Sequence, residues 1–210
     1  MAQVLKEEVQ RRLLKAAAGV FAERGFQAAT MAQIAALAGV ATGNVYRYYE
    51  NKDVLFEAVV PAGVVRELSS LVRGRVRALA GTDDIRDATR SAAWRLASEQ
   101  LIAFCIEHRL ATVILLLPGR ADGTPHAGFS ERMVPELVSL AVEHAATIGI
   151  DFQLDAARRF ALQRIYRGLL ATMAAALLES EEEAEIRSRI EAYSSYHLAG
   201  MKAFLEGDRT

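Results

Sequence analysis

The chain has 210 residues, of which 52% are hydrophobic and 24% are charged. This composition excludes disordered, collagen-like and fibrous proteins and supplies enough apolar side chains for one or two globular domains. The 25 basic and 26 acidic residues leave a formal net charge of -1, so bulk electrostatics gives no indication of a polyanionic partner. The single cysteine, Cys105, excludes an intramolecular disulfide.

No segment predicts export or membrane insertion. The first residues contain Lys6, Glu7 and Glu8, where a signal peptide has an apolar core. The candidate apolar run at residues 113–117 is far shorter than the roughly 20 residues of a membrane-spanning helix. We therefore expect a soluble, unprocessed, cytoplasmic protein.

The fold is expected to be all α-helical, because the chain has only four prolines and alanine and leucine recur at helical spacing. The first helix carries an apolar stripe from Leu5 to Phe21 and ends at Gly25. A capping box starts the second helix: the Thr30 hydroxyl accepts from the Gln33 amide, and the Gln33 side chain accepts from the Thr30 amide.

A short third helix follows a tight turn at Gly39 and extends from residue 41 or 42 to residue 48 or 49. Asn51 is expected to cap the fourth helix. Pro61 either kinks that helix or breaks it, so that a new helix starts there.

Longer helices are expected in the remainder of the chain. They are predicted over residues 62–80, 83–107, 109–117, 130–149, 154–178 and 181–205, with a loop at 118–128. The expected caps are Thr82 or Asp83, Ser130, Asp151 and Ser180, and Ser180 with Glu183 forms a second capping box. The arginines of the stretch 73–77 alternate along the chain, so we expect them to lie on a solvated surface.

Two short helices joined by a glycine turn, residues 30–38 and 41–49, are typical of a helix-turn-helix, whose second helix enters the DNA major groove. Ile34, Val40 and Val45 are apolar and are expected to fix the crossing of the two helices. The outward residues are polar or aromatic and suited to phosphates and base edges. They are Thr42, Gly43, Asn44, Tyr46, Arg47, Tyr48 and, just beyond, Lys52.

A family resemblance is carried by residues 21–30, 34–35, 38–40, 43, 45–49 and 51–55. Together they resemble the DNA-binding domain of TetR-family transcriptional regulators. The resemblance implies a dimeric, usually repressing regulator, with a DNA-binding domain at residues 1–55 and a helical effector-binding and dimerisation domain at residues 56–210. It also implies that double-stranded operator DNA, a second copy and a small, largely apolar effector are the partners.

The resemblance implies roles for single residues. Thr30 would donate to a backbone phosphate, Tyr46 would lie in the groove and Lys52 would bind a phosphate. Two residues depart from the family pattern. Ala41 replaces the usual N-cap serine, so Thr42 is expected to substitute as the cap, and Tyr49 replaces phenylalanine at a core position with its hydroxyl at the edge.

The C-terminal residues allow weaker predictions. Effector pockets are apolar with a few polar groups, and the candidates for lining one are Trp94, Phe104, His108, Phe129, Tyr166 and Met173. Small residues and a helical stripe are the candidates for a dimer interface: Ala161, Gly168, Ala175, Ile190, Tyr193, His197, Gly200 and Phe204. Intramolecular packing is the alternative interpretation of that stripe.

No enzymatic, metal or cofactor site is expected. Cys105 and His108 lie three residues apart, but no orienting group or oxyanion-hole motif accompanies them. The four histidines lack metal-binding spacing.

The sequence thus favours a homodimeric, ligand-responsive repressor that a small molecule releases from a near-palindromic operator. The alternative is a helical small-molecule-binding protein with a vestigial helix-turn-helix that acts through a protein partner. Residues 1–60 contain seven basic and six acidic residues, a net charge of +1. We therefore expect few phosphate contacts and a modest salt dependence, with Arg47 and Lys52 foremost.

Overall fold

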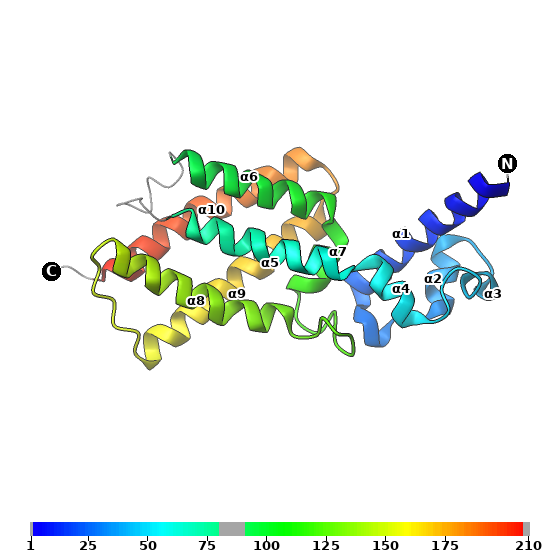
Figure 1. Ribbon diagram of the computed structural model, residues 1–210, viewed down its shortest axis with the longest axis horizontal. Coiled ribbons are helices and arrows are strands. Elements are labelled where there is room, and N and C mark those ends of the chain that lie inside the picture. The colour runs from blue at the N-terminus through cyan, green and yellow to red at the C-terminus, as the bar shows by residue number, and fades with distance from the viewer. Residues whose placement is uncertain (1, 80–90, 208–210) are drawn as a thin grey trace. The chain divides into compact units, whose positions relative to one another are not determined.

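The computed structural model describes residues 2–79 and 91–207, and their secondary structure confirms the all-α prediction (Figure 1). Within these ranges there are ten helices and no strand. The helices are α1 (Ala2–Ala28), α2 (Met31–Ala38), α3 (Thr42–Val45), α4 (Lys52–Val59), α5 (Ala62–Arg77), α6 (Ala92–Glu107), α7 (Arg109–Leu116), α8 (Phe129–Thr147), α9 (Ala156–Glu179) and α10 (Glu183–Glu206). None of those described is long and apolar enough to cross a membrane.

The chain divides into two compact units. The first unit contains residues 1–66 and 110–129, and the second contains residues 67–109 and 130–210. Each unit therefore combines segments that are distant in the sequence. The predicted boundary between residues 55 and 56 stays a prediction.

Local capping signals set the short helices of the first unit. Thr30 Oγ1 accepts from Gln33 N at 3.2 Å, and Thr30 N donates to Gln33 Oε1 at 3.0 Å, which confirms the first capping box. Gly39 ends α2 in the left-handed conformation, with a φ of 66°. Asn51 Oδ1 accepts from Val54 N at 2.9 Å and caps α4 as predicted.

The third helix is shorter than predicted, because α3 ends at Val45. Beyond it, Arg47 N donates to Asn44 O at 3.2 Å and Tyr48 N donates to Val45 O at 3.0 Å. Hydrogen bonds to the third preceding residue tighten the chain into a turn here, and Tyr49 N donates to Val45 O at 3.0 Å at its end.

Two predictions at helix starts in the first unit have clear outcomes. Ala41 is the N-cap of α3 and offers no side-chain hydrogen bond. Thr42 is the first helical residue, so the prediction that Thr42 acts as the cap was wrong. Pro61 breaks the chain between α4 and α5, and its carbonyl accepts from Val65 N at 3.3 Å. The missing amide of proline is harmless at this position, because no helical partner precedes it.

Several caps predicted for the second unit were wrong. Asp155, and not Asp151, caps α9: its Oδ1 accepts from Arg158 N at 2.7 Å. Ser130 lies inside the first turn of α8, which starts at Phe129. The candidates at residues 82 and 83 lie outside the described residues, and the described start of α6 is capped by Ser91.

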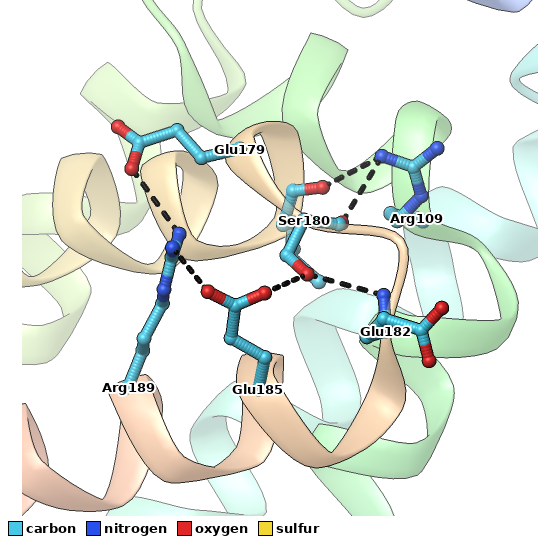
Figure 2. A network of polar contacts seen from close by, with 7 residues as sticks. Arg109, Glu179, Ser180, Glu182, Glu185 and Arg189 are labelled. Carbon is cyan, nitrogen blue, oxygen red and sulfur yellow. Dashed lines mark hydrogen bonds and ion pairs between the residues drawn. The ribbon is translucent and has the colours of Figure 1, made fainter.

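The second capping box was also wrong, because Ser180 bonds to other partners (Figure 2). Its hydroxyl accepts from Glu182 N at 3.1 Å and donates to Glu185 at 2.6 Å, instead of pairing with Glu183. Arg189 then donates to Glu185 at 2.6 Å. The network links α9 to α10, which pack against one another in the second unit.

An interruption in α1 fits the predicted stop at Gly25, whose φ of 78° and ψ of 162° are non-helical. Just beyond it, Phe26 N donates to Arg120 O at 2.8 Å. A Cβ atom at Gly25 would lie 3.2 Å from Gly119 O. The backbone angles and the close approach both require glycine here.

We predict opposite effects for two glycine substitutions in α1. Gly25→Ala lowers the free energy of unfolding by about 1–3 kcal/mol, because this backbone region is nearly restricted to glycine. Gly19→Ala is the matched control: a Cβ there meets nothing within 4 Å, and alanine raises the stability by roughly 0.5–1 kcal/mol. Chemical denaturation measures both, and equal effects would contradict the role of Gly25.

Candidate nucleic-acid interface

The segment from α3 through the following turn presents most of the predicted DNA-contacting residues to solvent. Thr42, Gly43, Asn44 and Arg47 are exposed, and the Tyr46 side chain is 53% exposed. An exposed tyrosine of this size offers an apolar ring and a hydroxyl to a partner. The structure therefore brings these five predicted residues together on one short stretch of chain.

Buried residues on the opposite side hold this segment against α2. Ile34, Ala35 and Val45 are fully buried, and Val40 is half-buried. Val40 N donates to Ala35 O at 3.0 Å across the turn. The alternation of buried and exposed positions follows from the pairing of two short helices around a tight turn.

The other two tyrosines of the cluster are less accessible than Tyr46. Tyr48 is half-buried. Tyr49 is buried, and its hydroxyl is enclosed without a hydrogen-bond partner among the described residues. The expectation of a hydroxyl at the edge of the core was therefore wrong for Tyr49.

At the start of α2, Thr30 is exposed and its oxygen accepts from Gln33 N. Because a hydroxyl can accept and donate at once, the Thr30 proton stays available for a phosphate oxygen. This geometry is compatible with the predicted phosphate contact.

Lys52 lies at the start of α4, and its ammonium already donates to backbone carbonyls. Nζ donates to Phe26 O at 2.7 Å, to Ala29 O at 2.9 Å and, more weakly, to Gln27 O at 3.4 Å. It also lies 4.3 Å from the centroid of the Phe26 ring. An ammonium has three donors, so Lys52 cannot bind a phosphate without releasing a carbonyl at the end of α1.

Arg12 provides a second cap of the same kind, which the sequence patterns did not reveal. Its Nε donates to Ala38 O at 2.9 Å and its Nη2 donates to Gly39 O at 2.9 Å, with a further contact from Nη2 to Ala38 O. The guanidinium thus binds the carbonyls at the C-terminus of α2, where a cation is favourable.

The positions predicted for the effector pocket divide into two groups. Trp94 lines a cavity of about 620 Å³ in the second unit. Trp94 and Tyr166 line a neighbouring cavity of about 40 Å³, and Met173 lines one of about 10 Å³. Phe104, His108 and Phe129 line none of these three cavities.

The prediction for residues 73–77 was wrong at its central arginine. Arg73 pairs with Glu136 at 2.7 Å and Arg77 is exposed, but Arg75 turns inward and lines both larger cavities. Alternate residues of a helix point in different directions, so one of three alternating arginines can turn inward and be half-buried. The alternation in the sequence is therefore compatible with one inward-facing arginine.

Two of the eight residues predicted for the dimer interface pack within the chain. Ile190 and His197 are buried in the second unit, which corrects their assignment to an intermolecular surface. The others are half-buried or, in one case, exposed. The half-buried residues are Ala161, Gly168, Ala175, Tyr193 and Phe204, and the exposed one is Gly200.

Cys105 is buried, and the ring of His108 lies 4.5 Å from that of Phe104. Within residues 2–79 and 91–207, no group of three or more histidine, cysteine, aspartate or glutamate side chains is placed to hold a metal ion.

Comparison with known proteins identifies the region that contains this interface. The model of a family of bacterial regulatory proteins, the tetR family, matches residues 13–59, which include all of α2, α3 and α4. A solved structure of a TetR transcriptional regulator from Rhodococcus sp. RHA1 is similar at 19% identity, with a TM-score of 0.38, over 96% of this chain and 97% of that one.

Two relatives from Mycolicibacterium smegmatis match part of the chain. The HTH-type transcriptional activator FasR is 38% identical over 87 residues, which are 41% of this chain and 38% of that protein. The HTH-type transcriptional repressor KstR2 is 32% identical over 104 residues, which are 49% of this chain and 45% of that protein. The matched segments therefore span less than half of either relative.

We predict that Lys52→Met lowers the free energy of unfolding by about 1–3 kcal/mol, because it leaves partly buried carbonyls at the end of α1 without their donor. Methionine keeps the apolar stem, so packing is retained. Lys15→Met, at an exposed position of α1, is the control and changes stability by less than about 0.5 kcal/mol. Urea denaturation compares them, and a Lys52 variant as stable as the wild type would show that the cap is dispensable.

Proposed function

The chain belongs to the TetR family of transcriptional regulators, and from this premise we propose that it regulates transcription as a ligand-responsive homodimer bound to operator DNA. The observation that carries the proposal is the exposed row of Thr42, Gly43, Asn44, Tyr46 and Arg47 within the region that the family model matches. The family is one of regulatory proteins, not of enzymes. Its action would take place in the cytoplasm, where the DNA lies.

Base edges would be read by the short α3 segment. Asn44 and Thr42 carry groups that hydrogen-bond to bases, and the Tyr46 ring can pack against a sugar or a thymine methyl group. Arg47 and the Thr30 hydroxyl would contact phosphates. In a dimer, two such segments would enter successive major grooves about 34–36 Å apart, or a multiple of that distance, on a near-palindromic site.

We further propose repression, with release of the DNA when an effector binds the second unit. The family resemblance favours repression, while the two relatives carry the names of an activator and a repressor. An effector can shift the balance between two conformers only through its different affinity for each. The cavity of about 620 Å³ has a volume suited to a small organic ligand.

Exposed apolar residues on α9 and α10 support assembly with a second copy. The Phe160 side chain is 60% exposed and that of Tyr196 is 72% exposed. Around Tyr196, the exposed residues Ala192, Ala199 and Gly200 are small enough for close helix packing. We therefore shift the proposed interface from the buried side of α10 to this exposed side.

Mobility-shift assays with the DNA that flanks the chain's own gene test the DNA-binding proposal. The double variant Tyr46→Ala with Arg47→Ala should lower the affinity at least about tenfold, since each direct contact contributes about 1–3 kcal/mol. Arg95→Ala removes an exposed arginine of the second unit and should leave affinity unchanged. Absence of sequence-selective binding at moderate salt would contradict the proposal, and a regulatory phenotype that the double variant leaves unchanged would favour a vestigial helix-turn-helix.

Sedimentation equilibrium tests the dimer. Tyr196→Glu should raise the dimer dissociation constant at least about tenfold, because it places a charge in an apolar contact. Leu96→Glu, which alters another exposed apolar residue of the second unit, should leave the dissociation constant unchanged. A wild-type monomer at micromolar concentration, or equal effects of the two substitutions, would argue against this surface.

A further inference from the structure

Arg75 of α5 is enclosed by polar and aromatic groups from two other helices. Its Nε donates to Ser98 Oγ of α6 at 3.1 Å, and its Nη2 donates to Ser194 Oγ of α10 at 3.3 Å. Its guanidinium carbon lies 4.8 Å from the centroid of the Trp94 ring. These contacts fix the orientation of the group.

The Arg75 charge has no carboxylate partner among the described residues, since both of its hydrogen bonds go to neutral hydroxyls. A guanidinium has five N–H donors, so these two bonds leave others unused. Burial lowers the pKa of Arg75 to about 10, and the group is therefore still cationic at neutral pH. A half-buried charge without a counter-ion among the described residues is less favourable than a paired one, and a ligand can supply the partner.

The titratable side chains that face Arg75 do not neutralise it. Burial, followed by the charge of Arg75, lowers the pKa of His197 to about 4, and burial raises the pKa of Tyr166. Both are uncharged at neutral pH. His144, only 6% exposed, also lines the smaller cavity, and both of its ring nitrogens lack partners in the described part of the chain.

Arg75 and Trp94 line the cavity of about 620 Å³, together with the apolar Leu96 and Ile102 of α6. Two carboxylates also border it. Glu99 is paired with Arg187 at 2.9 Å, and Glu191 is exposed. The cavity thus combines an apolar wall with one half-buried cation that pairs with no carboxylate in the described part of the chain.

We propose that this cavity binds an apolar organic acid, whose single carboxylate pairs with Arg75 and whose apolar body lies along Trp94, Leu96 and Ile102. The proposal rests on the proposed function, because it gives the chemical class of the effector. A guanidinium matches a carboxylate in geometry and charge. One half-buried positive charge favours a monoanion over a phosphate monoester, whose second charge would have no partner.

Trp94 is the only tryptophan of the chain, so its fluorescence reports directly on this cavity. Titration of the full chain compares octanoate with octanol, which has the same chain length and no charge. The wild type should bind octanoate with saturation and at least about tenfold more tightly than octanol. Equal affinity for the two probes, or no saturable binding of octanoate, would overturn the proposal without any variant.

Variants assign the preference to Arg75. Arg75→Gln should bring the affinities for octanoate and octanol to within about twofold of one another, and Arg75→Lys should retain part of the preference. Arg95→Gln is the matched control: Arg95 lines the same cavity but is exposed, and the preference should survive. Circular dichroism verifies that each variant is folded, and loss of the preference in Arg95→Gln alone would overturn the assignment.

The titration needs no DNA, so failure of this inference and failure of the proposed function are distinguishable. A protein that shifts operator DNA and shows no preference for octanoate refutes only the effector class. A protein that binds octanoate through Arg75 and shifts no DNA refutes only the regulatory function.

Discussion

The DNA-binding unit depends on two cations that close helix C-termini. Lys52 binds carbonyls at the end of α1, and Arg12 binds carbonyls at the end of α2. Each bond joins segments more than 20 residues apart, which is the long-range restraint that short helices need. Because α3 has four residues and no side-chain cap, its position relies on the framework that these two cations hold. The exposed residues around Tyr46 are presented by that framework.

The groups to which each cation donates distinguish Lys52 and Arg12, which stabilise the fold, from Arg75, the candidate ligand-binding residue. Lys52 and Arg12 are directed at backbone carbonyls, whose partial negative charge at a helix end stabilises a cation. Arg75 is directed at two serine hydroxyls and an aromatic ring beside a cavity. It is held in place, and no carboxylate of the described residues pairs with it. A cation of this kind is preorganised for an anionic ligand, because its orientation is set before the ligand arrives.

The features that were predictable from the sequence are the local ones. The capping box at Thr30, the left-handed Gly39 and the Asn51 cap depend on residues within three or four positions, and the residue types identify them. The roles of Lys52 and Arg75 depend on partners that only the folded chain brings near. Helical periodicity identified an apolar stripe on α10, but periodicity cannot distinguish a partner within the chain from a second copy, and Ile190 and His197 proved to be internal.

We propose that the exposed α3 segment makes the DNA contact while Lys52 serves the fold, and the salt dependence of operator affinity distinguishes these two roles. Each phosphate contact contributes about 0.9 to the slope of log K against log salt. Arg47→Ala should therefore reduce the magnitude of the slope by about 2 for a dimer, and Lys52→Met should leave it within about 0.5 of the wild-type value. An equal reduction in both variants would contradict the account, because it would make Lys52 a phosphate ligand.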